Sequence, residues 1–127
     1  MPVSPLSPKT FNTILYCKNW SATVAFYRDI LELSITFGSD WFIEFQVTET
    51  ARLSVADEQR ASIKSSAGRG LTLTFQVEDA DKSWQHLQDK GVSLGPVKTH
   101  PWGARVFYFH DPEGQRLEFW SLLNDNG

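Results

Sequence analysis

The chain has 127 residues, which is enough for one domain with a hydrophobic core and too few for two domains of ordinary size. Its formal net charge of -3 gives no basic field, so nucleic acid is not expected as a partner. The single cysteine, Cys17, excludes an internal disulfide, and no apolar run is long enough for a signal peptide or a membrane span, so the sequence predicts a protein of the reducing cytoplasm.

Aromatic residues are frequent in this chain, which contains nine Phe and five Trp. Most of them are expected in the core of a sheet, because large rings bury much apolar surface. The surplus is also compatible with a ligand site that is apolar or that stacks on rings. The acidic balance slightly favours a cationic ligand.

The first half of the chain predicts a strand, a helix and three more strands. Residues 1–10 carry three prolines among serines and predict a loose arm. Phe11–Cys17 has strand composition, with Cys17 as a small buried hydrophobe. Asn19 can cap a helix whose apolar stripe is Trp20, Val24, Tyr27 and Leu31. Short strand-like runs follow at residues 33–37, 41–47 and 52–55.

The second half of the chain predicts the same order of elements. Residues 57–70 are polar, contain Gly and Ser and lack periodicity, so they are interpreted as a connector. Residues 71–77 alternate strictly between apolar and polar side chains, which is typical of a strand with one buried face. Asp79 can cap the next helix, and Gly91 can end it. Its apolar stripe is Ala80, Trp84 and Leu87.

The last predicted elements are a weak strand at residues 92–97 and a hairpin. Ala104–His110 and Arg116–Leu122 are rich in aromatic and branched residues. Between them, Pro112 suits the second position of a turn and Gly114 tolerates a positive φ. This completes a second βαβββ module, and residues 123–127 form a tail.

The two modules can be superposed as an internal repeat. Laying Cys17 on Val77 places Asn12 over Thr72 and Val24 over Trp84, so the repeat holds in pattern more than in identity. Two such modules predict a domain with pseudo-twofold symmetry.

Together with this order, three sequence motifs resemble a known family. They are FYRDIL at the end of the first helix, PWG before the seventh strand and DPEGQRLEF across the last hairpin. The chain resembles the vicinal oxygen chelate superfamily of glyoxalases, bleomycin resistance proteins and extradiol dioxygenases. The likeness covers residues 11–122 as a single domain, with module one at 11–56, the connector at 57–70 and module two at 71–122.

The resemblance implies an α+β fold in which two tandem βαβββ modules form a curled-sheet partial barrel around a ligand cavity. It also implies that the protein is often a homodimer, with modules paired within or between chains. Enzymes of this superfamily usually hold a divalent metal through His or Gln, Glu, His and Glu on strands one, four, five and eight.

The positions that match those metal ligands carry Asn12, Ser54, Thr72 and Glu118. Only Glu118 is a good ligand for a first-row divalent metal, because amide and hydroxyl oxygens are weak neutral donors. One carboxylate does not offset the cost of dehydrating an ion and ordering its other ligands. We therefore expect no cofactor, and if a metal is bound, Glu118 is its ligand.

Strand alternation identifies the side chains that face the expected cavity. If the leucine face of residues 71–77 packs under the helices, the alternate residues face the cavity, and the repeat extends this to module one. The residues so placed are Asn12, Ile14, Tyr16, Arg52, Ser54, Thr72, Thr74, Gln76, Arg116, Glu118 and Trp120. A few hydrogen-bonding groups among apolar walls are typical of a small-molecule site. The alternative for Glu118 is an internal ion pair with Arg52 or Arg116.

Trp102 is a further candidate for ligand contact. It lies between Pro101 and Gly103 on a loop that leads into the seventh strand, from which an indole could stack on a planar or cationic ligand. The alternative is a hydrophobic plug between the modules. No histidine has metal or triad spacing, and Glu44 and Glu49 are assigned to solvent.

Three functions agree with these observations. The first is a metal-free small-molecule binding protein of the bleomycin-resistance type, which confers antibiotic resistance by sequestering an aromatic or cationic compound. The second is a metal-dependent lyase, isomerase or dioxygenase that uses Glu118. The third is an accessory domain without catalysis, whose cavity is filled by bulky side chains such as Tyr16, Phe107 and Trp120. The acidity, the aromatic richness and the missing ligands favour the first over the second, so catalysis is not the leading expectation, and the sequence does not separate the first from the third.

Overall fold

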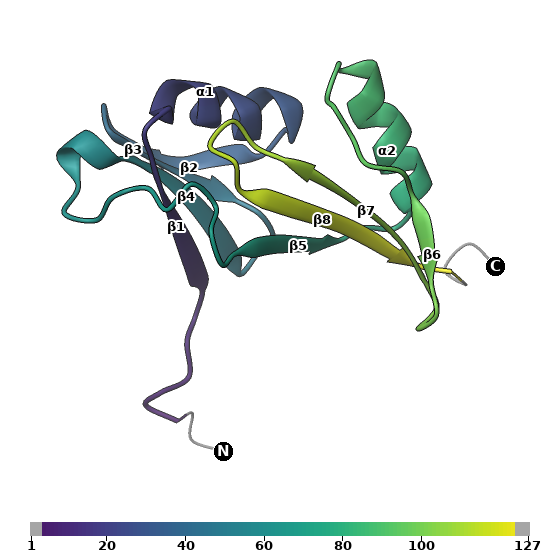
Figure 1. Ribbon diagram of the computed structural model, residues 1–127. Helices are drawn as coiled ribbons and strands as arrows, with labels where there is room; N and C mark the ends of the chain where they lie inside the picture. Colours follow the sequence, from purple (N-terminus) through teal and green to yellow (C-terminus); the bar gives the residue numbers. More distant parts are fainter. Residues whose placement is uncertain (1–3, 124–127) are drawn as a thin grey trace. The chain divides into compact units, whose positions relative to one another are not determined.

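The computed structural model describes residues 4–123 (Figure 1). The chain divides into two compact units, Met1–Ser66 (unit 1) and Ala67–Gly127 (unit 2). Each unit holds one four-stranded sheet and one main helix, which confirms the predicted α+β class with tandem βαβββ modules. The first three residues of the expected arm and all of the expected tail except Leu123 lie outside the described residues.

Unit 1 is built on a sheet with strand order β1-β4-β3-β2. Its strands are β1 (Phe11–Cys17), β2 (Ser34–Gly38), β3 (Phe42–Gln46) and β4 (Ala51–Asp57). Its helical segments are α1 (Trp20–Ala25), the π-helical turn η1 (Phe26–Ile30) and the 3₁₀ turn η2 (Glu58–Arg60). The chain enters on β1 and returns beside it on β4, so these two strands are parallel while the other pairs are antiparallel.

Unit 2 repeats this arrangement with strand order β5-β8-β7-β6. Its elements are β5 (Thr72–Gln76), α2 (Ala80–Asp89), β6 (Lys98–His100), β7 (Ala104–His110) and β8 (Arg116–Leu122). β5 and β8 are the parallel pair. The ranges predicted for β1, β7 and β8 agree with the structure residue for residue.

The register of the parallel pair is the same in both units. The pair Asn12↔Arg52 in unit 1 is equivalent to Thr72↔Arg116 in unit 2. In the same way, Ile14↔Ser54 in unit 1 is equivalent to Thr74↔Glu118 in unit 2. The predicted superposition of Asn12 on Thr72 is therefore present in three dimensions. Ser54 and Glu118 also occupy equivalent positions, each on the strand that runs parallel to the first strand of its unit.

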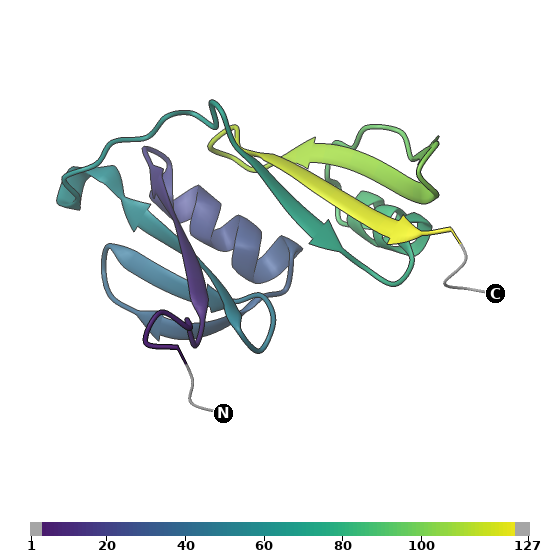
Figure 2. The ribbon, with the colours of Figure 1, turned by 90° about the horizontal axis from the view of Figure 1, so that it is seen from below.

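In each unit the helix covers one face of the sheet, as Figure 2 shows. Apolar side chains fill the space between the helix and this face. In unit 1 the fully buried rings there are Tyr27 and Phe45, with Cys17 buried as expected. In unit 2, Phe107 and Leu117 are fully buried, and Phe107 stacks on Phe109 at a centroid distance of 5.8 Å. The opposite face of each sheet, called the open face below, carries the candidate site residues.

The two helices begin differently. Asp79 caps α2 as predicted, because its carboxylate accepts a hydrogen bond from the amide of Lys82 at 3.2 Å, and Gly91 follows the helix with φ of +84°. Asn19 occupies the cap position of α1, but its side chain makes no capping bond, which corrects the prediction. Its backbone carbonyl instead accepts from both the amide and the hydroxyl of Thr23.

The weak strand predicted at residues 92–97 is wrong. These residues have no regular structure, and β6 begins only at Lys98. Gly95 makes one backbone bond to Tyr108, and its carbonyl accepts the indole N–H of Trp84 at 2.8 Å. Pro96 has no N–H to donate, so a regular ladder can start only after it.

Candidate functional site

The open face of unit 2 carries polar and aromatic side chains from β5, β7 and β8. The register places Thr74, Glu118 and Tyr108 in one row across the three strands. The residues at the intervening positions of β8 point to the helix side. Ser121 is one of them, and its hydroxyl accepts the backbone N–H of Ala80 at the start of α2. Alternation therefore separates the helix side from the open face, as the sequence predicted.

Glu118 is half-buried at the centre of this face, and its partner is Tyr108. The Tyr108 hydroxyl donates a hydrogen bond of 2.7 Å to Oε2 of Glu118. This bond, together with burial and the carboxylate charge, raises the pKa of the Tyr108 phenol above its ordinary value, against a smaller opposing effect of Arg116. The Tyr108 phenol therefore keeps its proton to a higher pH than an ordinary tyrosine does.

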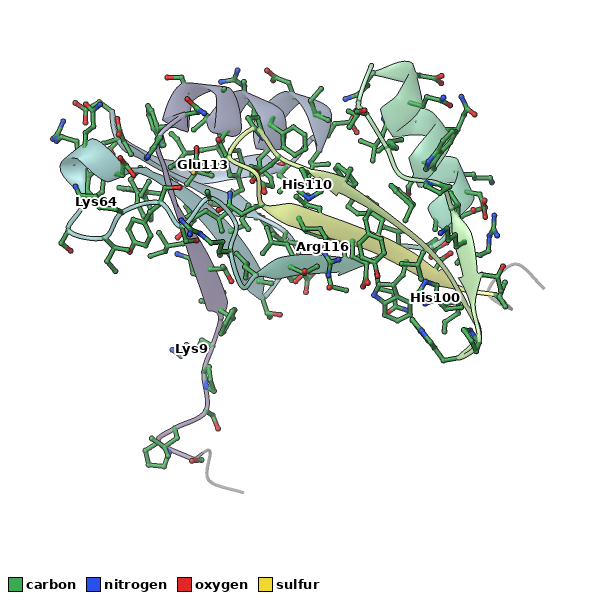
Figure 3. The ribbon with its side chains drawn as sticks, in the orientation of Figure 1. Lys9, Lys64, His100, His110, Glu113 and Arg116 are labelled. Carbon is green, nitrogen blue, oxygen red and sulfur yellow. The ribbon has the colours of Figure 1, made fainter. Side chains whose placement is uncertain are left out.

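Arg116, labelled in Figure 3, is two residues before Glu118 on β8 and lies on the same face. Its guanidinium carbon is 4.6 Å from the centroid of the Tyr108 ring, a cation–π contact, and its Nε donates to the hydroxyl of Thr72 at 2.9 Å. Arg52, in unit 1, donates to the backbone carbonyls of the turn before β4, among them Thr48 at 3.0 Å. Each of the two arginines considered as ion-pair partners of Glu118 thus has a different main contact.

An aromatic cluster adjoins Glu118. Trp102 lies in the turn between β6 and β7, and its ring packs edge-on against Trp120 at a centroid distance of 5.3 Å. His100, labelled in Figure 3, is the third ring, 6.2 Å from Trp102. Trp102 is 57% exposed, although a large apolar ring is stabilised by burial. Trp120 follows Glu118 by two residues on β8, so indole and carboxylate share one face.

The open face of unit 1 carries the equivalent positions with different chemistry. The hydroxyl of Ser54, which is fully buried, donates to the side-chain oxygen of Asn12 at 2.9 Å. Glu44 on β3 stands opposite Ser54 and accepts the hydroxyl of Thr36 at 2.7 Å. Glu44 is half-buried there, and its exposed hydrogen bond with Thr36 gives it a partner that the sequence did not reveal.

The structure thus gathers the predicted residues into two groups. Unit 1 brings Asn12, Tyr16, Arg52 and Ser54 to its open face, and unit 2 does so for Thr72, Thr74, Glu118 and Trp120, with Trp102 at the rim. Sequence reasoning missed Tyr108 and Glu44. Counting outward from the loop at 111–115 pairs Tyr108 with Glu118, so the hairpin itself held the signal for Tyr108.

The donors at the matched positions do not fit a divalent first-row metal. Ser54 and Asn12 bond to each other, Thr72 accepts from Arg116, and Glu118 is the one carboxylate of the set. Within residues 4–123, no three His, Cys, Asp or Glu side chains are grouped so that they could hold an ion. Such metals prefer imidazole, thiolate and carboxylate ligands, and these positions supply too few.

A model of the glyoxalase-like domain family matches residues 11–124, nearly the whole chain. This chain belongs to the glyoxalase-like domain family. Membership confirms the resemblance to the vicinal oxygen chelate superfamily. A relative, the uncharacterised protein YraH of Bacillus subtilis (strain 168), is 30% identical over 122 residues, which cover 86% of this chain and 94% of YraH.

Solved structures share the glyoxalase-like fold at lower identity. Lactoylglutathione lyase from Agrobacterium tumefaciens superposes with a TM-score of 0.74 at 23% identity, covering 94% of this chain and 95% of that one. TnmS3, an antibiotic binding protein from Streptomyces sp. CB03234, gives 0.75 at 17% identity, covering 95% and 99%. The fold is therefore shared with both an enzyme and a binding protein. No helix among the described residues is long and apolar enough to cross a membrane.

Proposed function

We propose that this glyoxalase-like protein binds a small planar compound of aromatic and cationic character and sequesters it, without metal and without transforming it. The observation that carries the proposal is the exposed indole of Trp102, which packs against Trp120, and Trp120 is two residues from Glu118 on the same face of β8. Aromatic platforms with one fixed charge are typical of sites for such ligands.

The indole pair supplies the stacking surface. Trp120 contacts Trp102 edge-on, so it fixes the orientation of the exposed ring. A ring that is already oriented loses little conformational freedom when a ligand stacks on it, and this lowers the entropic cost of binding. A flat ligand would also remove the exposed apolar surface of Trp102 from water.

Glu118 supplies the charge. Its Oε2 accepts the hydrogen bond of the Tyr108 hydroxyl, which orients the carboxylate. Arg116, the nearest cation on this face, is directed to Thr72 and the Tyr108 ring. A ligand cation would therefore meet a carboxylate whose position is set by neutral hydrogen bonding.

The donor chemistry at the metal positions supports binding over metal-dependent catalysis, and the shared fold of TnmS3, named as an antibiotic binding protein, is compatible with binding. The fold of lactoylglutathione lyase keeps a lyase as the alternative, but that reaction class gains no support from Asn12, Ser54 and Thr72 as donors.

The first test compares proflavine, a planar cation, with acridone, a neutral molecule of similar shape, by calorimetry and tryptophan fluorescence. Glu118→Gln keeps the shape of the side chain and removes its charge. We expect it to weaken proflavine binding by about 1 to 3 kcal/mol, the scale of a charge-assisted hydrogen bond, and to leave acridone binding unchanged. Glu78→Gln removes an exposed charge of the same unit and serves as the control.

A second variant separates stacking from charge. Trp102→Ala should weaken both compounds by about 1 kcal/mol or more, because stacking area is lost whatever the ligand charge. If neither compound quenches tryptophan fluorescence, the proposed function is wrong. It is also wrong if Glu118→Gln unfolds the protein without any effect on binding, because Glu118 would then be a structural residue.

A further inference from the structure

The open face of unit 2 carries more charges than the one that the proposed function uses. Arg116 is exposed there, two residues before Glu118 on β8. The register adds Lys98 of β6, because Lys98 is the direct partner of Val106, and Val106 is the direct partner of Trp120. This face is therefore not acidic as a whole, and a ligand that is only a cation meets like charges beside Glu118.

Tyr108 keeps the two opposite charges apart. Its hydroxyl donates to Oε2 of Glu118 at 2.7 Å, while the guanidinium carbon of Arg116 lies over its ring, 4.6 Å from the centroid. The ion pairs within residues 4–123 do not include Arg116. The carboxylate and the guanidinium are thus held near each other on one face without forming an ion pair.

The contacts of Arg116 leave one edge of its guanidinium for a ligand. Nε donates to the hydroxyl of Thr72 at 2.9 Å, and the contact with Tyr108 uses one face of the plane. The two terminal nitrogens bond to no acceptor in the part of the chain that the structure describes. They form a fork that can bind a carboxylate through two parallel hydrogen bonds. Because Thr72 and Tyr108 already orient the side chain, such binding costs less conformational entropy.

The spacing along β8 sets the order of the parts of a ligand. Trp120, Glu118 and Arg116 are alternate residues of this strand, so their backbone positions follow one another at intervals of about 7 Å. An ammonium and a carboxylate on one carbon atom, with a charge-assisted hydrogen bond on each side, span roughly 8 Å. One α-amino acid group therefore fits between Glu118 and Arg116, while a ring attached to it extends toward the indoles.

We propose that the ligand of this site is an aromatic zwitterion, a compound in which a flat ring is attached to an α-amino acid group. The ring stacks on Trp102, the ammonium bonds to Glu118, and the carboxylate bonds to the two terminal nitrogens of Arg116. Arg116 is then the residue that determines specificity, because it selects the zwitterion over a plain cation. This inference rests on the proposed function and names the ligand class for the same site.

The test compares L-tryptophan with tryptamine, which lacks the carboxylate, and with indole-3-propionate, which lacks the ammonium, by calorimetry at neutral pH. The wild-type protein should bind L-tryptophan at least tenfold more tightly than either, since each of the others loses one charge-assisted contact. Arg116→Gln should weaken L-tryptophan binding roughly tenfold to a hundredfold. The same variant should tighten tryptamine binding, because it removes a like charge beside the ammonium.

Two further variants separate the fork of Arg116 from its charge. Arg116→Lys keeps the charge and loses the fork, so it should recover only part of the L-tryptophan affinity. Lys98→Gln removes the other cation of this face, two strands from Glu118, and should leave the ratio of L-tryptophan to tryptamine affinity as in wild type. If Lys98→Gln lowers this ratio and Arg116→Gln does not, the assignment of Arg116 is wrong.

Proflavine, which has no acidic group, keeps this inference apart from the proposed function. If proflavine binding depends on Glu118 but L-tryptophan binds no more tightly than tryptamine, the zwitterion is wrong and the proposed function stands. If Arg116→Gln weakens L-tryptophan, tryptamine and proflavine by the same factor, Arg116 is a structural residue and the inference is also overturned. If neither proflavine nor tryptamine binds to the wild-type protein, the proposed function fails, and the inference fails with it.

Discussion

At the scale of single residues, the two units use the same pair of positions with exchanged chemistry. In unit 2 the carboxylate of Glu118 is on β8 and the hydroxyl of Tyr108 is opposite it on β7. In unit 1 the hydroxyl of Ser54 is on β4 and the carboxylate of Glu44 is opposite it on β3. Each unit therefore keeps one acid and one hydroxyl at its centre, a combination that serves hydrogen bonding better than metal binding.

The Tyr108–Glu118 bond predicts an alkaline pH dependence. The folded-state pKa of Tyr108 is raised above its ordinary value of 10.0, first by the hydrogen bond to Glu118. A raised pKa means that the folded protein holds the proton more tightly than the unfolded chain does, so the stabilisation is complete below that ordinary value and is lost as the pH rises through the folded-state pKa.

Tyr108→Phe tests this dependence. Urea unfolding should show wild type more stable than the variant at neutral pH, with the difference shrinking in strongly alkaline buffer. In a spectroscopic titration, the difference between wild type and variant is the phenolate signal of Tyr108. The midpoint of this signal should lie above the ordinary pKa of tyrosine. A midpoint at or below that value would contradict the hydrogen bond.

At the scale of elements, the two helices are stabilised by different means. α2 has a side-chain cap at Asp79 and a glycine with positive φ after its end. It is also joined to the sheet by an ion pair with two hydrogen bonds, in which Arg105 on β7 donates to Asp81 at 2.7 and 3.1 Å. α1 lacks the side-chain cap and widens into a π-helical turn, where Leu31 donates to the carbonyl of Phe26 at 3.1 Å. It depends more on the burial of Tyr27 and Val24.

Removing the cap of α2 should therefore be measurable. Asp79→Ala leaves the amide of Lys82 without its acceptor, and we expect a loss of about 1 kcal/mol in the free energy of unfolding. Glu78→Ala removes the same charge one residue earlier, at an exposed position before the helix, and should change stability by less than about 0.5 kcal/mol. Denaturant unfolding of the two variants gives the comparison, and equal losses would show that charge, not the cap, matters.

At the scale of the whole molecule, the donor set predicts that metals do not stabilise the protein. A ligand that binds the folded state raises its melting temperature by an amount that grows with the logarithm of its affinity, and a site with Glu118 as its single carboxylate binds too weakly for a measurable rise. Thermal melts with added Zn, Ni, Mn or Fe(II) should match the metal-free protein. Stoichiometric metal that survives dialysis would refute this expectation.

We also expect a homodimer. Each sheet has two edge strands, and unpaired edges need cover. The edges of unit 1 also expose large apolar side chains: Phe11 on β1 is 69% exposed and Phe37 on β2 is 55% exposed. The superfamily resemblance implies that the partner is a second copy of the chain, and a symmetric pair would cover these edges in both copies. Sedimentation velocity at micromolar concentration should give twice the monomer mass, and a monomer there would refute the prediction.

The sequence by itself determined the order of elements, three strands to the residue, the capped start of α2 and the side chains that share each open face. These features are local: alternation along a strand and the capping of a helix depend on neighbours in the chain. Family membership followed from the same local motifs.

Only the tertiary structure decided which groups meet across strands and loops. The bond from Tyr108 to Glu118 depends on the register of β7 against β8, and the contact of Trp102 with Trp120 depends on the path of the turn before β7. Periodicity tells which way a side chain points, whereas the partner it meets is set by contacts between residues far apart in the sequence.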